Sequence, residues 1–258
     1  MNKENNTQNS AVIKIENLTK RFEDIVAVNN LNLEIKEGEL FAFLGPNGAG
    51  KTTTIKILTG LLKPTVGRAF INGVDIQENP LEAKKIIGYI PDHPYLYEKL
   101  SGRDFFHFVG DLFKIPRTTQ IELMDFYFNL FGLQNAKNKL IENYSHGMRQ
   151  KLIFSVCLMH NPKVIIIDEP MVGLDPKSTR IVKNILKEKS REGITVFLST
   201  HTLSIAEELA DRIGIINYGK LIFLGTLQEL KESSRKEGTL EELFLKLTEE
   251  EDLDGTSF

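Results

Sequence analysis

The stretch that decides the fold lies between a continuous apolar segment and a segment with helical spacing. It consists of Gly45, Pro46, Asn47, Gly48, Ala49, Gly50, Lys51 and Thr52. These residues fit the pattern G-x-x-x-x-G-K-[ST] of a phosphate-binding loop. The preceding residues 39–44 are nearly continuous in apolar character, which is typical of a strand buried on both faces. The pattern therefore lies where a phosphate-binding loop must lie, between a strand and a helix.

The residue types of this loop predict its chemistry. Glycines let the backbone wrap so that successive N–H groups face a phosphate, and the start of the helix adds the positive end of its dipole. We expect Lys51 to reach the β and γ phosphates of ATP and the Thr52 hydroxyl to ligate Mg²⁺. Thr53, the next residue of the predicted helix, belongs to the same set of expected ATP contacts.

A second buried strand ends in two carboxylates. Residues 164–167 read VIII and are followed by Asp168 and Glu169. Such a strand places Asp168 at the carboxyl edge of a sheet, within reach of a metal beside the phosphate-binding loop. Glu169 then points to the other side and is a candidate to orient or deprotonate an attacking water. An Asp-Glu pair can also cap the next helix, but the phosphate-binding loop favours the catalytic interpretation.

The surrounding segments predict an α/β fold. Residues 11–18 and 31–35 alternate apolar and polar side chains with period two, as half-buried antiparallel strands do. Residues 67–76 carry an Asn-Gly dipeptide between two short β-type runs, which predicts a hairpin. Beyond them strands alternate with helices, which indicates a largely parallel sheet. We therefore expect a P-loop NTPase core with a largely parallel sheet, an antiparallel β subdomain and an inserted α-helical subdomain.

The inserted subdomain is expected at about residues 92–160. From Gly102 to Gln134 the pattern is helical and rich in Phe, which is typical of the core of a helical unit. The phenylalanines of this segment are Phe105, Phe106, Phe108, Phe113, Phe126, Phe128 and Phe131. Cys157 lies in an apolar run near the end of the subdomain, which predicts a small buried hydrophobic residue.

The composition excludes several other classes of protein. The chain has 258 residues, enough for a large domain, and its net charge of -3 gives no support to nucleic-acid binding by bulk charge. A single cysteine excludes an internal disulfide. No apolar stretch approaches the roughly 18 to 20 residues that span a bilayer, and the N-terminus lacks a signal-peptide apolar region. We expect a cytoplasmic protein with a membrane role only through a partner.

Three more motifs accompany the loop and the carboxylate pair. Residues 144–150 read YSHGMRQ, residues 173–176 read GLDP, and residues 199–201 read STH. In order and spacing, the five motifs resemble the nucleotide-binding domain of ATP-binding cassette (ABC) transporters over roughly residues 11–230. The resemblance implies that residues 11–232 are the ABC ATPase domain. Residues 1–10 lack an apolar pattern, which predicts a disordered tail, and residues 233–258 end in an acidic run, which predicts a C-terminal helical, acidic tail.

The resemblance also implies roles for particular residues. Two such domains close head to tail, and each ATP lies between the phosphate-binding loop of one and the signature loop of the other. Phe22 stacks on adenine, Asp92 contacts both Mg²⁺ and the transmembrane partner, and His201 contacts the γ phosphate. The signature residues that face the opposing ATP are Ser145, His146, Gly147 and Met148.

The chain departs from the family pattern at two places. The signature usually reads Leu-Ser-Gly-Gly-Gln, whereas only Ser145 and Gly147 keep those identities here. Asp92 occupies a position that is usually Gln or Glu. Because Asp is one methylene shorter, we expect Asp92 to reach Mg²⁺ through water.

These observations predict an ATPase subunit that hydrolyses ATP in a closed dimer and powers a separate permease, with export favoured. It would lie in the cytoplasm, peripheral on the inner face of the cell membrane, as a homodimer or a heterodimer of ATPase subunits. The substrate path would lie in another polypeptide, so the sequence does not identify the cargo. The alternatives are an ABC ATPase that acts on nucleic acid or ribosomes, without transport, and a small-molecule P-loop kinase.

Overall fold

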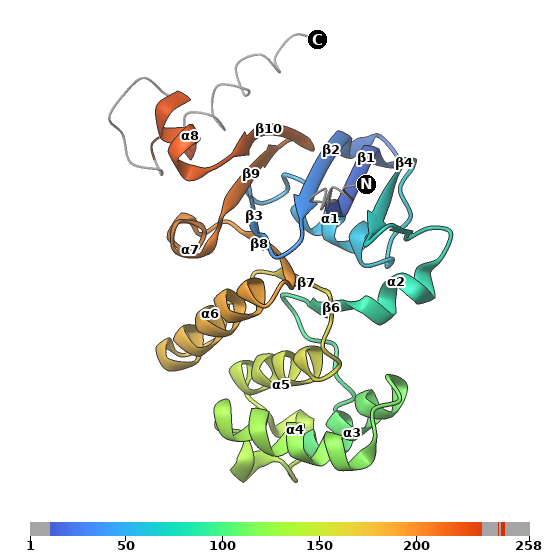
Figure 1. Ribbon diagram of the computed structural model, residues 1–258, viewed down its shortest axis with the longest axis vertical. Helices are drawn as coiled ribbons and strands as arrows, with labels where there is room; N and C mark the ends of the chain where they lie inside the picture. Colours follow the sequence, from blue (N-terminus) through green and yellow to red (C-terminus); the bar gives the residue numbers. More distant parts are fainter. Residues whose placement is uncertain (1–10, 234–241, 243, 246–258) are drawn as a thin grey trace, which may run out of the picture.

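The computed structural model describes residues 11–233, 242, 244 and 245 (Figure 1). The tail predicted at residues 1–10 lies outside the described residues, as does most of the tail predicted at residues 233–258. Within the described part of the chain, no helix combines the length and the apolar character needed to cross a bilayer.

Two β-sheets form the upper part of the molecule in Figure 1. In the described residues, a four-stranded antiparallel sheet has the order β2-β1-β4-β5, and a six-stranded sheet has the order β10-β9-β3-β8-β7-β6. The four pairings from β9 to β6 are parallel, and β10 is antiparallel to β9. The strands are β1 (Ala11–Phe22), β2 (Ile25–Lys36), β3 (Leu40–Leu44), β4 (Val66–Ile71), β5 (Val74–Asp75), β6 (Ile87–Ile90), β7 (Val164–Asp168), β8 (Thr195–Thr200), β9 (Arg212–Asn217) and β10 (Lys220–Gly225).

The sheets confirm the predicted fold class. The alternating segments pair as antiparallel β1 and β2, and Asn72-Gly73 connects β4 to β5 as a hairpin. All residues of β3 and β7 are buried, as continuous apolar strands of a parallel sheet should be. The α2–β6 segment was not recognised from the sequence, because a seven-residue helix followed directly by a four-residue strand is too short to establish a period.

The helices fall into two groups. Those that follow strands of the larger sheet are α1 (Lys51–Leu58), α6 (Pro176–Arg191), α7 (Leu203–Leu209) and α8 (Leu227–Ser233), and α2 (Pro80–Ile86) precedes β6. The second group forms a separate lower part of Figure 1, which we call the helical lobe. It contains α3 (Gly102–Leu112), α4 (Arg117–Leu130), the 3-10 turns η1 (Gln134–Ala136) and η2 (Ile141–Asn143), and α5 (His146–Met159).

The phenylalanine core predicted for the helical lobe is correct only in part. Phe106 and Phe128 are fully buried and meet edge to face, with ring centroids 5.7 Å apart. Phe126 and Phe108 are exposed, so their assignment to the core was wrong. Phe113 instead stacks on the His160 ring at 3.9 Å, at the end of α5. The helices of the lobe are amphipathic, and helical spacing alone did not distinguish the phenylalanines that face the core from those that face outward.

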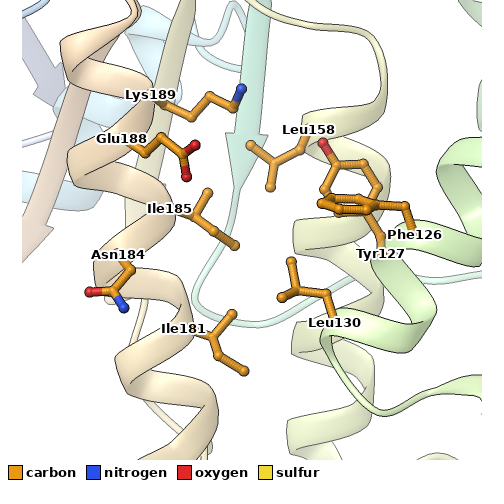
Figure 2. A pocket seen from close by; sticks show the side chains of 9 residues that line it. All are labelled: Phe126, Tyr127, Leu130, Leu158, Ile181, Asn184, Ile185, Glu188 and Lys189. Carbon is orange, nitrogen blue, oxygen red and sulfur yellow. The ribbon is translucent and has the colours of Figure 1, made fainter.

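The central helix of the lobe, α5, packs on both sides, against α3 and α4 and against the sheet at β6. Cys157 is buried on it beside Gly88, as predicted for a small hydrophobic residue, and burial raises the pKa of its thiol to about 12. The packing of α4 against α6 leaves a hollow of about 280 Å³, and Figure 2 shows side chains of these two helices facing each other across it. This hollow is lined by Phe126, Tyr127, Leu130, Leu158, Ile181, Asn184, Ile185, Glu188 and Lys189.

Candidate active site

The loop between β3 and α1 has the geometry of an anion cradle. Gly48 and Gly50 have φ values of +82° and +109°, which favour glycine. A Cβ at Gly50 would lie 2.4 Å from the Ala27 carbonyl oxygen, so the loop approaches β2 more closely than another residue would allow. Helix α1 starts at Lys51 and receives no side-chain cap from Gly50. The N–H groups of its first turn therefore have no side-chain cap and are suited to an anion.

Lys51 is folded back over this loop. Its ammonium donates to the carbonyl oxygens of Gly45 and Pro46, at 2.7 and 3.0 Å. The side chain is 7% exposed, and this burial lowers the pKa of Lys51, while the nearby Glu169 and Asp168 carboxylates act in the opposite direction. The cation thus lies among groups of opposite charge at the mouth of the loop.

The carboxylate of Asp168 joins the loop to the sheet. The Thr52 hydroxyl donates to Asp168 Oδ2 at 2.9 Å, and the Ser199 hydroxyl donates to Oδ1. The parallel register of β7 and β8 explains the second contact, because Asp168 lies directly opposite Ser199. The predicted convergence of Thr52 and Asp168 is therefore present in the structure, and two oxygens of the type that Mg²⁺ prefers lie together.

Glu169 has a left-handed backbone, with φ of +50°. Such a value is uncommon for a residue with a Cβ. Its Oε1 accepts from the His201 backbone N–H at 3.1 Å and contacts His201 Nδ1 at 2.7 Å, and its Oε2 accepts from the Thr200 hydroxyl at 3.2 Å. The strand end and this φ value together direct the two neighbouring carboxylates to different partners, as the sequence predicted.

Ser145 is the N-cap of α5, and its hydroxyl accepts from the Met148 N–H at 3.3 Å. Ser145 and His146 are exposed, while Gly147 and Met148 are partly covered. The start of α5 belongs to the helical lobe, whereas the phosphate-binding loop belongs to the sheet region (Figure 1). The structure therefore keeps the two predicted anion sites on separate parts of the chain.

Tyr144, which replaces the usual Leu of the signature, has a structural partner. Its buried hydroxyl donates to the Ala136 carbonyl at 2.8 Å, and burial raises the pKa of the phenol to about 12. A Cβ at Gly102 would lie 2.1 Å from that hydroxyl. Tyr144 and Gly102 are thus matched to each other, so this departure from the family pattern belongs to the packing of the helical lobe.

Asp92 and Phe22 are less directly joined to the site. Among the described residues, the Asp92 carboxylate pairs with His93 at 2.8 Å and has no hydrogen bond to Thr52 or Asp168. Phe22 is 44% exposed at the end of β1, and the Lys20 ammonium lies 4.9 Å from its ring centroid. An exposed aromatic face with a cation beside it can stack on a base.

The sequence reasoning assigned no role to Ser199, although it recognised the motif that contains it. It likewise assigned no role to Thr200 or to Gly173. A Cβ added at Gly173 would lie 2.0 Å from the His146 ring. The strand register could have revealed the first contact, since two adjacent parallel strands that both end in polar residues place those residues side by side.

Comparison with known proteins identifies the family. The profile described as ABC transporter matches residues 28–172. The bacitracin transport ATP-binding protein BcrA of Bacillus licheniformis is 38% identical over 228 residues, which are 88% of this chain and 74% of BcrA.

Two solved structures extend the comparison to the fold. One, described as the ATP-binding subunit of an ABC transporter, matches with a TM-score of 0.87 at 28% identity and covers 92% of this chain and 99% of its own. Another, a dimeric ATP-binding cassette in a post-hydrolysis state bound to ADP and Pi, matches with a TM-score of 0.76 at 26% identity over 83% of this chain and 98% of its own. The chain thus belongs to the ABC transporter family, as an ATP-binding subunit that hydrolyses ATP.

Proposed function

We propose that two cassette subunits enclose two ATP molecules head to tail and that their closure powers a separate transmembrane permease. The observation that carries this proposal is the convergence of Lys51, Asp168 and Glu169 on one loop, while the second anion site at Ser145 lies on another lobe. A two-fold pair brings the loop of each chain to the Ser145 helix of its partner, and it does so twice. The dimeric cassette with bound ADP and Pi supports this arrangement.

In this proposal the ATP phosphates lie in the cradle formed by Gly45 to Thr53, and Lys51 leaves its loop carbonyls to contact the β and γ phosphates. Thr52 and Asp168 hold Mg²⁺, which neutralises charge on the β and γ oxygens when bound. Among the described residues, no group of three or more His, Cys, Asp or Glu side chains could hold a metal ion, so Thr52 and Asp168 would hold Mg²⁺ only together with ATP. Asp92 contributes through a water molecule.

Glu169 acts on the nucleophile. A water oxygen attacks the γ phosphorus, the bond to the ADP oxygen breaks, and a water proton passes to the Glu169 carboxylate. His201 contacts Glu169 Oε1 through Nδ1 at 2.7 Å, and in this proposal its other ring nitrogen contacts the γ phosphate. Ser145, His146, Gly147 and Met148 of the opposing chain offset the charge of the same phosphate with N–H and O–H groups. Phe22 stacks on the adenine.

The permease would dock on the helical lobe, beside Asp92. Tyr95 and Tyr97 follow Asp92 on the chain and are 92% and 61% exposed. Tyr97 meets Phe108 edge to face at 5.3 Å, so two exposed aromatic rings lie side by side. Such a patch is typical of a protein interface. We place the subunit in the cytoplasm on the inner face of the membrane and, given that BcrA is a bacitracin transport protein, favour export.

Replacement of Glu169 tests this function. Glu169→Gln should keep MgATP affinity within about twofold and reduce phosphate release at least about 100-fold, because the amide cannot accept the proton. Asp168→Asn is the matched control at the neighbouring carboxylate, and it should weaken Mg²⁺-dependent binding as well. Free phosphate without any acceptor identifies a hydrolase and excludes the kinase alternative. Near-normal turnover of Glu169→Gln would overturn the proposal.

A further inference from the structure

The hydroxyl of Thr200 lies next to the proposed catalytic carboxylate. Thr200 is the last residue of β8 and is fully buried. Its Oγ1 lies 3.2 Å from Glu169 Oε2 and accepts the Thr202 backbone N–H at 3.0 Å. A carboxylate accepts hydrogen bonds, and the amide already occupies one acceptor position of the hydroxyl. The single hydrogen of Thr200 is therefore directed at Glu169.

The two oxygens of Glu169 are held by different residues. Oε1 is held twice by His201, through the backbone N–H and through Nδ1. The terminal torsion of a Glu side chain is broad and has no steep minimum, so hydrogen bonds to both oxygens set the plane of the carboxylate. The Thr200 hydroxyl holds Oε2 and so fixes the plane of the carboxylate. The left-handed backbone at Glu169 does not enforce this plane by itself.

We propose that Thr200 is a positioning residue for ATP hydrolysis, which sets the carboxylate plane of Glu169 toward the attacking water. The inference rests on the proposed function of Glu169. It assigns no contact between Thr200 and ATP, since the buried hydroxyl is already used on both sides. The 3.2 Å separation is at the long end for an O–H···O bond, so we expect a moderate effect on rate.

The test compares Thr200→Val, which removes the hydroxyl at nearly constant shape, with Thr200→Ser, which retains it. We expect Thr200→Val to lower kcat about tenfold and to leave KM for MgATP within about twofold, and Thr200→Ser to recover most of the loss. Thr200→Ala provides the same deletion if the Val variant does not fold. Thr195→Val is the matched control, because Thr195 lies on the same strand and, within the described part of the chain, its hydroxyl bonds to the backbone of Lys36 and Gly38 and not to Glu169.

A double-mutant cycle separates positioning from a general structural effect. In single-turnover measurements with MgATP, Thr200→Val should lower the residual rate of Glu169→Gln less than twofold if it acts through Glu169. An equal tenfold loss in both backgrounds, wild-type kcat in folded Thr200→Val, or no recovery by Thr200→Ser would overturn the inference. Near-normal turnover of Glu169→Gln itself would instead overturn the proposed function, so the two failures are distinguishable.

Discussion

Asp168 and Glu169 are adjacent in the sequence but have different partners. Asp168 continues the strand and is joined to Thr52 and Ser199, whereas Glu169 turns toward Thr200 and His201. The positive φ of Glu169 accompanies this divergence. Residues in unusual backbone conformations concentrate at functional sites, because the surrounding contacts must hold them there. Here the contacts come from the end of β8 and from His201, which follows it, and they hold both carboxylates at the end of β7.

Phe22 gives a prediction at the scale of one side chain. If its exposed ring stacks on adenine, Phe22→Ala should weaken MgATP binding about 5- to 30-fold, since base stacking contributes roughly 1 to 2 kcal/mol. Phe22→Tyr should remain within about twofold. Ile25→Ala is the matched control, because Ile25 pairs with Phe22 across the same hairpin and is 69% exposed. Titration of the folded variants with MgATP measures the effect. Unchanged MgATP affinity of Phe22→Ala would show that adenine does not stack on the Phe22 ring.

The sequence predicted those contacts that follow from local order. Lys51, Thr52 and Asp168 occupy positions that a loop pattern and a strand end determine, and the structure brings them together. The Thr200 contact was not predictable in this way, because it joins two residues that are 31 positions apart in the sequence and depends on the register of β7 against β8. Nor was the pairing of Asp92 with His93, which depends on the course of a loop after β6.

At the scale of elements, α6 is fixed at its start by Asp175. This residue is the N-cap, accepting from the Ser178 N–H at 2.9 Å, and its carboxylate pairs with Lys151 of α5 at 2.7 Å. The Lys151 contact, followed by those of Ser178, holds the pKa of the Asp175 carboxyl well below its usual range. The same short segment therefore joins the helical lobe to the helix that follows β7.

This cap predicts a specific dependence of stability on pH. The folded-state pKa is depressed, so the stabilisation by the carboxylate is present above its unfolded pKa of about 3.9 and is lost as the pH falls through the folded-state pKa. Asp175→Asn keeps a cap but loses the charge, and should lower the free energy of unfolding by about 0.5 to 1 kcal/mol at pH 7. The difference from wild type should narrow as the pH falls below about 4.

Urea unfolding of wild type and Asp175→Asn at a series of pH values measures this effect. Glu82→Gln is the control, because Glu82 forms an exposed ion pair with Lys85 on the short helix α2 and should change stability less. A difference between wild type and Asp175→Asn that stays constant down to pH 3 would contradict the assignment to the carboxylate charge.

The elements that the sequence missed or misplaced share a physical cause. Helix α2 and strand β6 are short and adjoin directly, so neither establishes a period. Phe108 and Phe126 are aromatic residues on amphipathic helices, and composition assigned them to the core although they lie outside it. Which face of a helix is inside depends on its neighbours in space, and the sequence does not list those neighbours.

At the scale of the whole molecule, the proposed nucleotide site has two halves, one in the sheet region and one in the helical lobe. The sheet region carries Lys51 and the carboxylates, and the helical lobe carries the start of α5, which Ser145 caps. In the absence of ATP, facing copies would oppose Lys51 charges and unpaired N–H groups, so we expect them to remain largely separate. In the proposed dimer, ATP would supply the anion that both halves bind, and loss of its γ phosphate would remove the shared contact.

Sedimentation velocity of the Glu169→Gln protein tests this central claim most directly. Samples contain MgATP, MgADP or no nucleotide, and two double variants add Ser145→Arg or, as a charge-matched control on an exposed position of the same lobe, Thr118→Arg. We predict a dimer with MgATP alone, which Ser145→Arg abolishes and Thr118→Arg preserves. A dimer that forms equally in all three conditions, or one that is indifferent to Ser145→Arg, would contradict the head-to-tail arrangement.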